Sequence, residues 1–352
     1  MTHVPRPARR ARRTLLAALA AFFALQAGMT VVMDDWLPVL HDPEYGYKLA
    51  SLRQRLAERP RHDLTVVLGS SRSDMGFDPE SLPPRVTADG RDEIVFNMAI
   101  TGCGPVQELQ ILHRLLRHGV RPGRVLIEVH PLMLHQEAGI GEEQWIEPRR
   151  MDWRDVLLVK DYVFDPSRFV WRWCRCRLAP WYSNRFLILD RFARKWLEHP
   201  DAVHPWSVLS DYGWFPATPV SAEQRQRGIE NANHEYAAML HEYRVTEPAD
   251  RALRNLLLLC QAERIEMALL VMPEASEFRA QYSPAARRHF NEYMERLSRE
   301  FRLAVYDGTE WCGDGDFWDS HHLVDTGATH FSQRFARAWA SFQARQTKRV
   351  LR

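Results

Sequence analysis

Residues 64–72 read Leu-Thr-Val-Val-Leu-Gly-Ser-Ser-Arg, and this stretch decides the fold class. Its first five residues are typical of a short strand that is buried on both faces, and Gly69 ends it. Strands of this kind belong to parallel sheets, which helices cover on both sides. A serine that follows such a strand lies at the carboxyl edge of the sheet, where open α/β folds bind their ligands. The stretch therefore predicts an α/β protein with Ser71 in a candidate site.

Outward from this strand, short apolar runs alternate with amphipathic segments. Further strands are expected at 93–97, 124–129, 267–272 and 303–306, and helices at 107–118, 251–262, 284–301 and 327–339. Continuous apolar strands that alternate with helices predict a three-layer fold around a parallel sheet of about five strands. The sheet domain is expected in two parts, residues 63–134 and 246–345.

The N-terminus predicts a membrane anchor. Residues 1–13 form a basic tail with five arginines, and residues 14–33 carry no charge. A helix needs about 20 mostly apolar residues to cross a bilayer, and arginines stay on the cytoplasmic side. We therefore expect a single-pass protein of a bacterial inner membrane, with its body in the periplasm or outside the cell. The small residues of 24–28 leave a cleaved signal peptide as the alternative.

Two further segments separate the anchor from the sheet and the two sheet parts from each other. Residues 34–62 predict a linker helix, and residues 135–245 predict a partly helical insertion that is rich in arginine. The insertion holds eight of the twelve tryptophans: Trp145, Trp153, Trp171, Trp173, Trp181, Trp196, Trp206 and Trp214. These aromatics either pack the insertion's own core or form a carbohydrate-binding surface.

Composition narrows the classes of partner. The chain has 352 residues, 45% of them hydrophobic, and a formal charge of +2, which argues against nucleic acid as the main ligand. The five cysteines match no zinc template, and no disulfide is assigned. A metal site would have to draw on Asp316, Asp319, His321, His322 and His330, which also fit no ligand template. We predict neither a metal nor a cofactor.

Three short motifs carry the chemistry. Ser71 follows the first strand, and 97–104, Asn-Met-Ala-Ile-Thr-Gly-Cys-Gly, follows the second. There Gly102 can present a backbone N–H to an oxyanion, and Asn97 is a candidate binding residue. Near the C-terminus, Asp319 and His322 are three residues apart and can face the same way. A carboxylate can orient an imidazole, which can then take the proton of a serine.

Together, Gly69-Ser70-Ser71, Gly102 and Asp319-x-x-His322 resemble the SGNH (GDSL-like) hydrolase superfamily. The ending His322-Leu323, Gly327-Ala328 and Phe331-Ser332 resembles membrane-anchored bacterial members that acylate cell-surface polymers, such as alginate acetylation and teichoic acid D-alanylation proteins. The resemblance covers about residues 62–134 and 250–340 and implies a flavodoxin-like SGNH fold. It also implies Ser71 as nucleophile, His322 as base and Asp319 as the group that orients it.

The third motif of that superfamily is altered. Gly-x-Asn is usual after the third strand, and its asparagine donates to the oxyanion, whereas this chain has Glu128-Val129-His130. His130 either donates from a ring nitrogen or only ends the strand before Pro131. Arg72, beside the nucleophile, either binds an anionic substrate group or pairs with a carboxylate such as Asp74.

The expected function is serine-dependent acyl transfer or ester hydrolysis, with O-acetyl as the expected group, on an envelope polysaccharide or exopolysaccharide. Water or a sugar hydroxyl can accept the acyl group, and small esters are possible substrates. A membrane-bound acyltransferase partner is implied by the resemblance alone. The alternative is a catalytically inactive polysaccharide-binding or assembly module, which the missing Gly-x-Asn motif favours and the intact Ser71 and Asp-x-x-His motif oppose.

Overall fold

The structure is a computed structural model that describes residues 6–84, 91–135, 141–199 and 205–350. The start of the predicted basic tail, residues 1–5, lies outside the described residues. The chain divides into two compact units, whose internal structures are given separately below. One unit, termed the anchor unit, comprises residues 1–47, 147–160 and 165–205. The other, termed the sheet unit, comprises residues 48–146, 161–164 and 206–352.

The sheet unit contains one five-stranded parallel sheet with the order β2-β1-β3-β4-β5. This confirms the predicted α/β class and the parallel sheet of about five strands. The order is that of doubly wound sheets, which reverse direction beside the first strand and bind ligands there. The strands are β1 (His62–Leu68), β2 (Asp92–Asn97), β3 (Arg124–Glu128), β4 (Glu266–Val271) and β5 (Ala304–Asp307).

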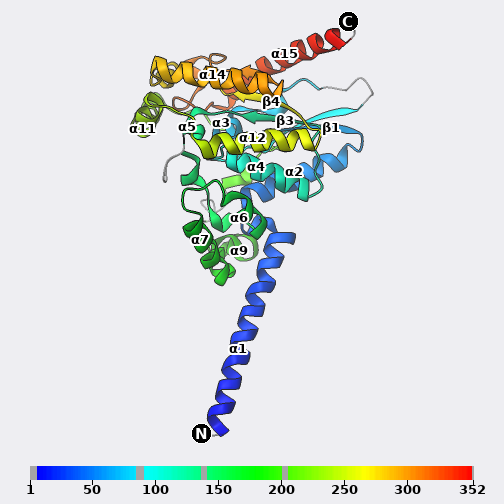
Figure 1. Ribbon diagram of the computed structural model, residues 1–352, viewed down its shortest axis with the longest axis vertical. Helices are drawn as coiled ribbons and strands as arrows, with labels where there is room; N and C mark the ends of the chain where they lie inside the picture. Colours follow the sequence, from blue (N-terminus) through cyan, green and yellow to red (C-terminus); the bar gives the residue numbers. More distant parts are fainter. Residues whose placement is uncertain (1–5, 85–90, 136–140, 200–204, 351–352) are drawn as a thin grey trace. The chain divides into compact units, whose positions relative to one another are not determined.

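Helices cover both faces of this sheet (Figure 1). On one face lie α4 (Pro105–Arg117) and α12 (Glu247–Ala262), which pack on each other. On the other lie α14 (Pro284–Phe301) and α15 (Asp325–Val350). The α15 helix buries Phe331, Phe335 and Trp339 in one apolar cluster with strand residues such as Val67 and Leu270. The three aromatics are spaced four residues apart, so they share one face of the helix.

Further helices complete the sheet unit. The helix α11 packs on α5 and α13, where Leu240 meets Leu132 and Phe278. Residues from 206 onward therefore belong to the sheet unit, in contrast to the single insertion expected over 135–245. The helices are α3 (Ser71–Gly76), α5 (Pro131–Leu134), α11 (Ala222–His241) and α13 (Ser276–Arg279), with a 3₁₀ turn at Gly141–Trp145.

The anchor unit is built around α1 (Arg6–Val31), which continues through a π-helical turn at Val32–Trp36. Residues 10–36 are long and apolar enough to cross a membrane. The unit also contains α6 (Trp153–Val159), α7 (Pro166–Leu178), α8 (Pro180–Ser183) and α9 (Arg185–Ala193). The boundary between the units falls inside α2 (Pro43–Glu58), which corresponds to the predicted linker helix.

Candidate active site

Ser71 is the first residue of α3, directly after β1. The helix begins there because Ser70 caps it, accepting a hydrogen bond from the backbone N–H of Arg72 at 3.2 Å. Ser71 itself is half-buried. The hydroxyl of Ser71 therefore lies at the rim of the sheet. Its position is fixed by the end of β1 and by the capped start of α3.

The turn before Ser71 is fixed by a side chain at the end of the neighbouring strand β3. Glu128, at the end of β3, accepts hydrogen bonds from the Ser70 backbone N–H at 2.8 Å and from the Ser70 hydroxyl at 2.9 Å. Gly69 leaves room for this carboxylate, because a Cβ there would lie 2.7 Å from Glu128 Cβ and 2.7 Å from Ser73 Oγ. Glycine is therefore required where the turn and the buried acid meet.

The structure brings Ser71, His322 and Asp319 together, although they are 251 and 3 positions apart in sequence. Ser71 Oγ lies 2.8 Å from His322 Nε2, and His322 Nδ1 lies 2.8 Å from Asp319 Oδ2. The carboxylate places the imidazole proton on Nδ1, which leaves Nε2 to accept the serine hydroxyl. The His322 ring is stacked on Trp318, with ring centroids 5.4 Å apart.

Asp319 is held in its ionised form. Burial favours the neutral acid, but the charges of His322 and His321 and the hydrogen bonds to the carboxylate outweigh it and lower the pKa of Asp319 below its ordinary value. Two of these bonds come from the backbone N–H groups of His321 and His322, each 2.7 Å from Asp319 Oδ1. The carboxylate is thus fixed in position and charge.

His130 lies beside this trio, at the start of α5. It is 5% exposed, its ring stacks on Phe278, and neither ring nitrogen has a hydrogen-bond partner among the described residues. Burial, together with repulsion from the charges of Arg72, His321 and His322, holds the pKa of His130 well below its usual range. The ring is therefore neutral, with one N–H to donate and no partner that competes for it.

Gly102 lies in the loop after β2, in a backbone conformation with φ of +73° that favours glycine. The loop runs beside the Ser71 turn, because Ile100 N donates to Gly69 O at 2.9 Å. The Trp145 side chain covers Gly102, and an added Cβ would lie 2.6 Å from Trp145 Cβ. No hydrogen bond between described residues links Gly102 to Ser71, so its part in an oxyanion hole stays a prediction.

Asn97 has a different task from the one expected. Its side-chain N–H groups donate to the carbonyls of Ser73 and Phe77, both at 2.8 Å, and its oxygen accepts from Ala99 N at 3.0 Å. Asn97 is fully buried. Because both ends of its amide bind the backbone, it positions α3 and has no hydrogen left to offer a substrate.

Arg72 pairs with a carboxylate, but not with Asp74. It is 2% exposed, donates to the carbonyls of Met272 and Pro273 at 2.9 and 2.8 Å, and lies 3.5 Å from Glu274. A guanidinium fixed in this way joins the start of α3 to the segment after β4. It supports the site from inside rather than forming an exposed anion-binding group.

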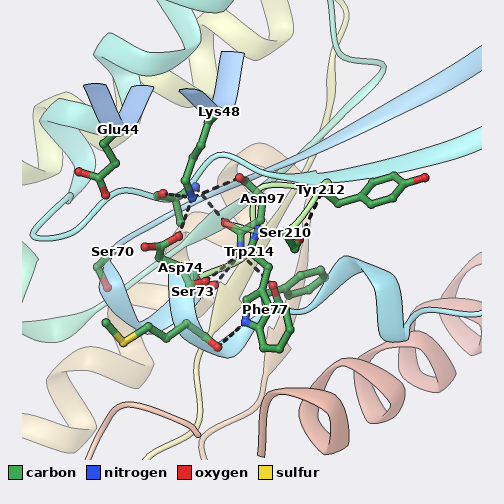
Figure 2. A network of polar contacts seen from close by, with 12 residues as sticks. Glu44, Lys48, Ser70, Ser73, Asp74, Phe77, Asn97, Ser210, Tyr212 and Trp214 are labelled. Atoms are coloured by element: carbon green, nitrogen blue, oxygen red, sulfur yellow. Dashed lines mark hydrogen bonds and ion pairs between the residues drawn. The ribbon is translucent and has the colours of Figure 1, made fainter. Parts of the chain in front are cut away.

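Sequence reasoning missed a second network, centred on Lys48 (Figure 2). This lysine of α2 is fully buried, and its ammonium lies 2.5 Å from Asp74 Oδ1 and 2.7 Å from Ala99 O. Trp214 Nε1 donates to Met75 O at 2.6 Å, and Phe215 N to Asp74 O at 3.1 Å. Lys48 and Trp214 thus hold α3, the helix that begins with Ser71, from two sides. Only an apolar neighbourhood around Lys48, with Leu49 and Leu52, pointed to its burial in the sequence.

The residues of the expected metal alternative are only partly brought together. Within the described chain, ligand atoms of Asp319, His321 and His322 lie within 4.8 Å of one another. The Asp319 and His322 atoms, however, already bind each other, the backbone and Ser71. Asp316 and His330 form a separate pair at 3.1 Å, in which His330 is exposed and Asp316 half-buried. The donor set therefore suits proton transfer better than metal binding.

The geometry as a whole can activate a serine hydroxyl. A base within hydrogen-bond reach and a carboxylate that orients it are the parts that nucleophilic acyl chemistry needs. No protein-family profile matches the chain, and no curated protein matches it, so these contacts carry the functional argument.

Proposed function

We propose that this protein is an SGNH-type esterase or O-acyltransferase that uses Ser71, His322 and Asp319. The observation that carries the proposal is the chain of two 2.8 Å contacts from Ser71 Oγ through the His322 ring to Asp319. The strand order and the position of Ser71 after β1 support it, because ligands of doubly wound sheets bind at that edge.

In the proposed mechanism, Ser71 attacks the carbonyl carbon of an ester while His322 Nε2 takes the hydroxyl proton. Asp319 stabilises the imidazolium that forms. The tetrahedral oxyanion is bound by the N–H of neutral His130 and by backbone N–H groups, with Gly102 as a candidate. The imidazolium then gives its proton to the leaving alcohol, and an acyl-enzyme remains. Water or a sugar hydroxyl accepts the acyl group with His322 again acting as base.

We propose that the substrate is a polysaccharide of the cell envelope, which either accepts the acyl group in transfer or carries the ester that is hydrolysed. We propose acetyl as the acyl group. This part of the proposal is supported by the resemblance to anchored acylating proteins and by a helix long enough to span a membrane at residues 10–36. Such an anchor keeps the site near the membrane, at the place where exported glycan chains emerge. A membrane-bound acyltransferase would then supply the acyl group.

A fluorophosphonate probe tests the proposal directly, because it labels only an activated serine. We expect the full chain in detergent to be labelled, and Ser71→Ala and His322→Gln to abolish labelling. The matched control is Ser73→Ala, since the Ser73 hydroxyl is buried in the same helix and has no hydrogen-bond partner among the residues that the structure describes. A folded protein that is not labelled, in parallel with no turnover of an acetyl ester, would reject the enzyme and favour a glycan-binding module.

A second assay separates hydrolysis from transfer. The full chain is incubated with an acetyl ester and candidate oligosaccharides, and the glycans are analysed by mass spectrometry. A mass gain of one acetyl group that requires Ser71 indicates transfer, and free acetate alone indicates hydrolysis. Labelling by the probe with neither product would leave the serine chemistry standing and reject acetyl as the group.

A further inference from the structure

The helices of the anchor unit present apolar side chains that no described residue of that unit covers. The helix α9 has the sequence Arg-Phe-Leu-Ile-Leu-Asp-Arg-Phe-Ala, yet none of its residues is buried. The short helix α8 buries only Pro180. Large aromatic side chains on this stretch are 46–73% exposed: Trp171, Trp181, Tyr182, Phe186, Phe192 and Trp196. A soluble surface rarely exposes so many neighbouring aromatics unless another phase or partner covers them.

The same stretch concentrates positive charge. Residues 166–196 hold eight basic residues and one acidic residue, a net charge of +7, whereas the whole chain carries only +2. Arginines lie over the exposed rings: Arg175 is 4.7 Å from the Trp171 ring centroid, and Arg185 is 4.3 Å from that of Tyr182. A surface that alternates guanidinium groups with aromatic rings matches an anionic phosphate layer above an apolar one.

The position of this surface on α1 points to the same occupant. Both α7 and α8 pack directly on α1. Residues 10–25 of α1 are exposed, and Gln26 is the first buried one. Gln26 lies seven residues before Met33, the end of the uncharged run, which is about 10 Å along the helix. Interfacial helices lie about 5–10 Å deep, at the boundary of headgroups and acyl chains.

We propose that residues 166–196, termed the collar, lie in the membrane interface around the outer end of α1. The aromatic rings of α8, α9 and Trp196 enter the acyl boundary, and the exposed arginines bind anionic lipid phosphates. Arg177 is excepted, because it is largely buried and pairs with Asp34. The collar restricts the tilt of the anchor and adds a second membrane contact to a single span. This inference does not depend on the acyl chemistry, but it rests on α1 spanning the membrane.

Depth measurements on the full chain test the collar. An environment-sensitive fluorophore is attached to a cysteine at Phe192 or Trp196, with Cys174, Cys176 and Cys312 replaced by serine and the two buried cysteines retained. Each labelled chain must show the thermal transition of the unlabelled protein. The chains are reconstituted in vesicles of phosphatidylcholine with or without phosphatidylglycerol. Lipids that carry a nitroxide near the carbonyl, and aqueous iodide, are the two quenchers.

Two control positions make the outcomes distinct. A label at Phe23, which is exposed in the middle of the apolar run, reports whether α1 enters the bilayer. A label at Glu223, exposed on α11 of the sheet unit, is the aqueous reference. We expect labels at 192 and 196 to be quenched by lipid nitroxide several-fold more than the label at 223, and more strongly with phosphatidylglycerol.

Other outcomes overturn the inference in separable ways. If the label at 23 is quenched by the lipid but those at 192 and 196 follow the aqueous reference, the anchor stands and the collar does not contact lipid. Its aromatic face would then be free for a protein partner. If the label at 23, like those at 192 and 196, is quenched by iodide and not by the lipid nitroxide, both the anchor and the collar are rejected. Fluorophosphonate labelling of Ser71 is unaffected by either result.

Discussion

At the scale of single residues, His130 is the side chain that most distinguishes the proposed site from the SGNH pattern that the sequence resembles. It stands where asparagine is expected, it is neutral, and its ring nitrogens have no partner among the described residues. A buried N–H group without an acceptor lowers the stability of the folded protein. An oxyanion that forms during the reaction would accept a hydrogen bond from this group.

We therefore predict that His130→Ala lowers kcat for an acetyl ester by about two to three powers of ten with little change in KM. The matched variant His130→Asn retains a donor and should keep more of the rate than alanine does. Steady-state kinetics of both variants check this. Equal rates for the wild type and the alanine variant would assign His130 to packing against Phe278 alone.

Glu142 is a residue-scale determinant of pH dependence. Burial raises its pKa to about 7, despite hydrogen bonds from the backbone N–H groups of Val106, Gln107 and Gly104 at the start of α4. In the unfolded chain the group titrates near its ordinary value of 4.5. Between pH 4.5 and 7 this group thus binds more protons in the folded state than in the unfolded one, so its contribution to stability falls as pH rises.

We predict that Glu142→Gln flattens this fall, which for one group is at most about 1.4 kcal/mol per pH unit. The free energy of unfolding is measured by denaturant titration at pH 5, 6 and 7. The control is Glu143→Gln, which removes the neighbouring carboxyl. An unchanged slope in the Glu142 variant would show that this carboxylate is ionised throughout the range.

At the scale of elements, α3, which begins with Ser71, is a short helix held by its neighbours. Six residues are too few for a stable isolated helix, so its position depends on the contacts from α2 and from the loop after β2. The Lys48–Asp74 pair is buried, with side chains 0% and 4% exposed. Removing one partner of a buried pair leaves a charge without compensation in the interior.

We predict that Lys48→Met lowers the free energy of unfolding by about 3–5 kcal/mol and slows labelling of Ser71. The double variant Lys48→Met/Asp74→Asn removes both charges and should recover part of the stability. The control Gln54→Met changes an exposed residue of the same helix and should have an effect below about 0.5 kcal/mol. Full stability of the Lys48 variant, measured by thermal and denaturant unfolding, would contradict the pairing.

The elements themselves were largely predictable from the sequence, and their boundaries less so. All five strands were expected because parallel strands buried on both faces leave continuous apolar runs such as 64–68. The partners of charged residues were not, since contacts such as Arg72 with Glu274 depend on segments about 200 residues apart. The segment 135–245, expected as one insertion, is divided between the two units, and its last part, including α11, packs in the sheet unit. A single sequence shows which side of a helix is apolar but not which element packs against that side.

At the scale of the whole molecule, charge is distributed very unevenly along the chain. Five arginines lie in residues 6–13 and a net charge of +7 in the collar, on the two sides of the uncharged run in sequence. The remainder is consequently acidic, although the total is only +2. The formal net charge close to zero is therefore the sum of two basic segments and an acidic remainder. The basic segments are attracted to anionic membrane surfaces, and the acidic remainder is repelled by these surfaces.

The anchor gives the last prediction. We expect the full chain to stay in the membrane fraction after an alkaline wash, with residues 1–33 retained in its intact mass. Replacing Phe22 and Phe23 with arginine places two charges in the middle of the span, each costing about 2.5–3.5 kcal/mol there, and should release the protein. Phe22→Leu/Phe23→Leu keeps the run apolar and should remain bound. A wild-type chain whose N-terminus begins near 24–28 would instead show that the helix is a cleaved signal peptide, and the collar, whose placement rests on α1 spanning the membrane, would then lose its support as well.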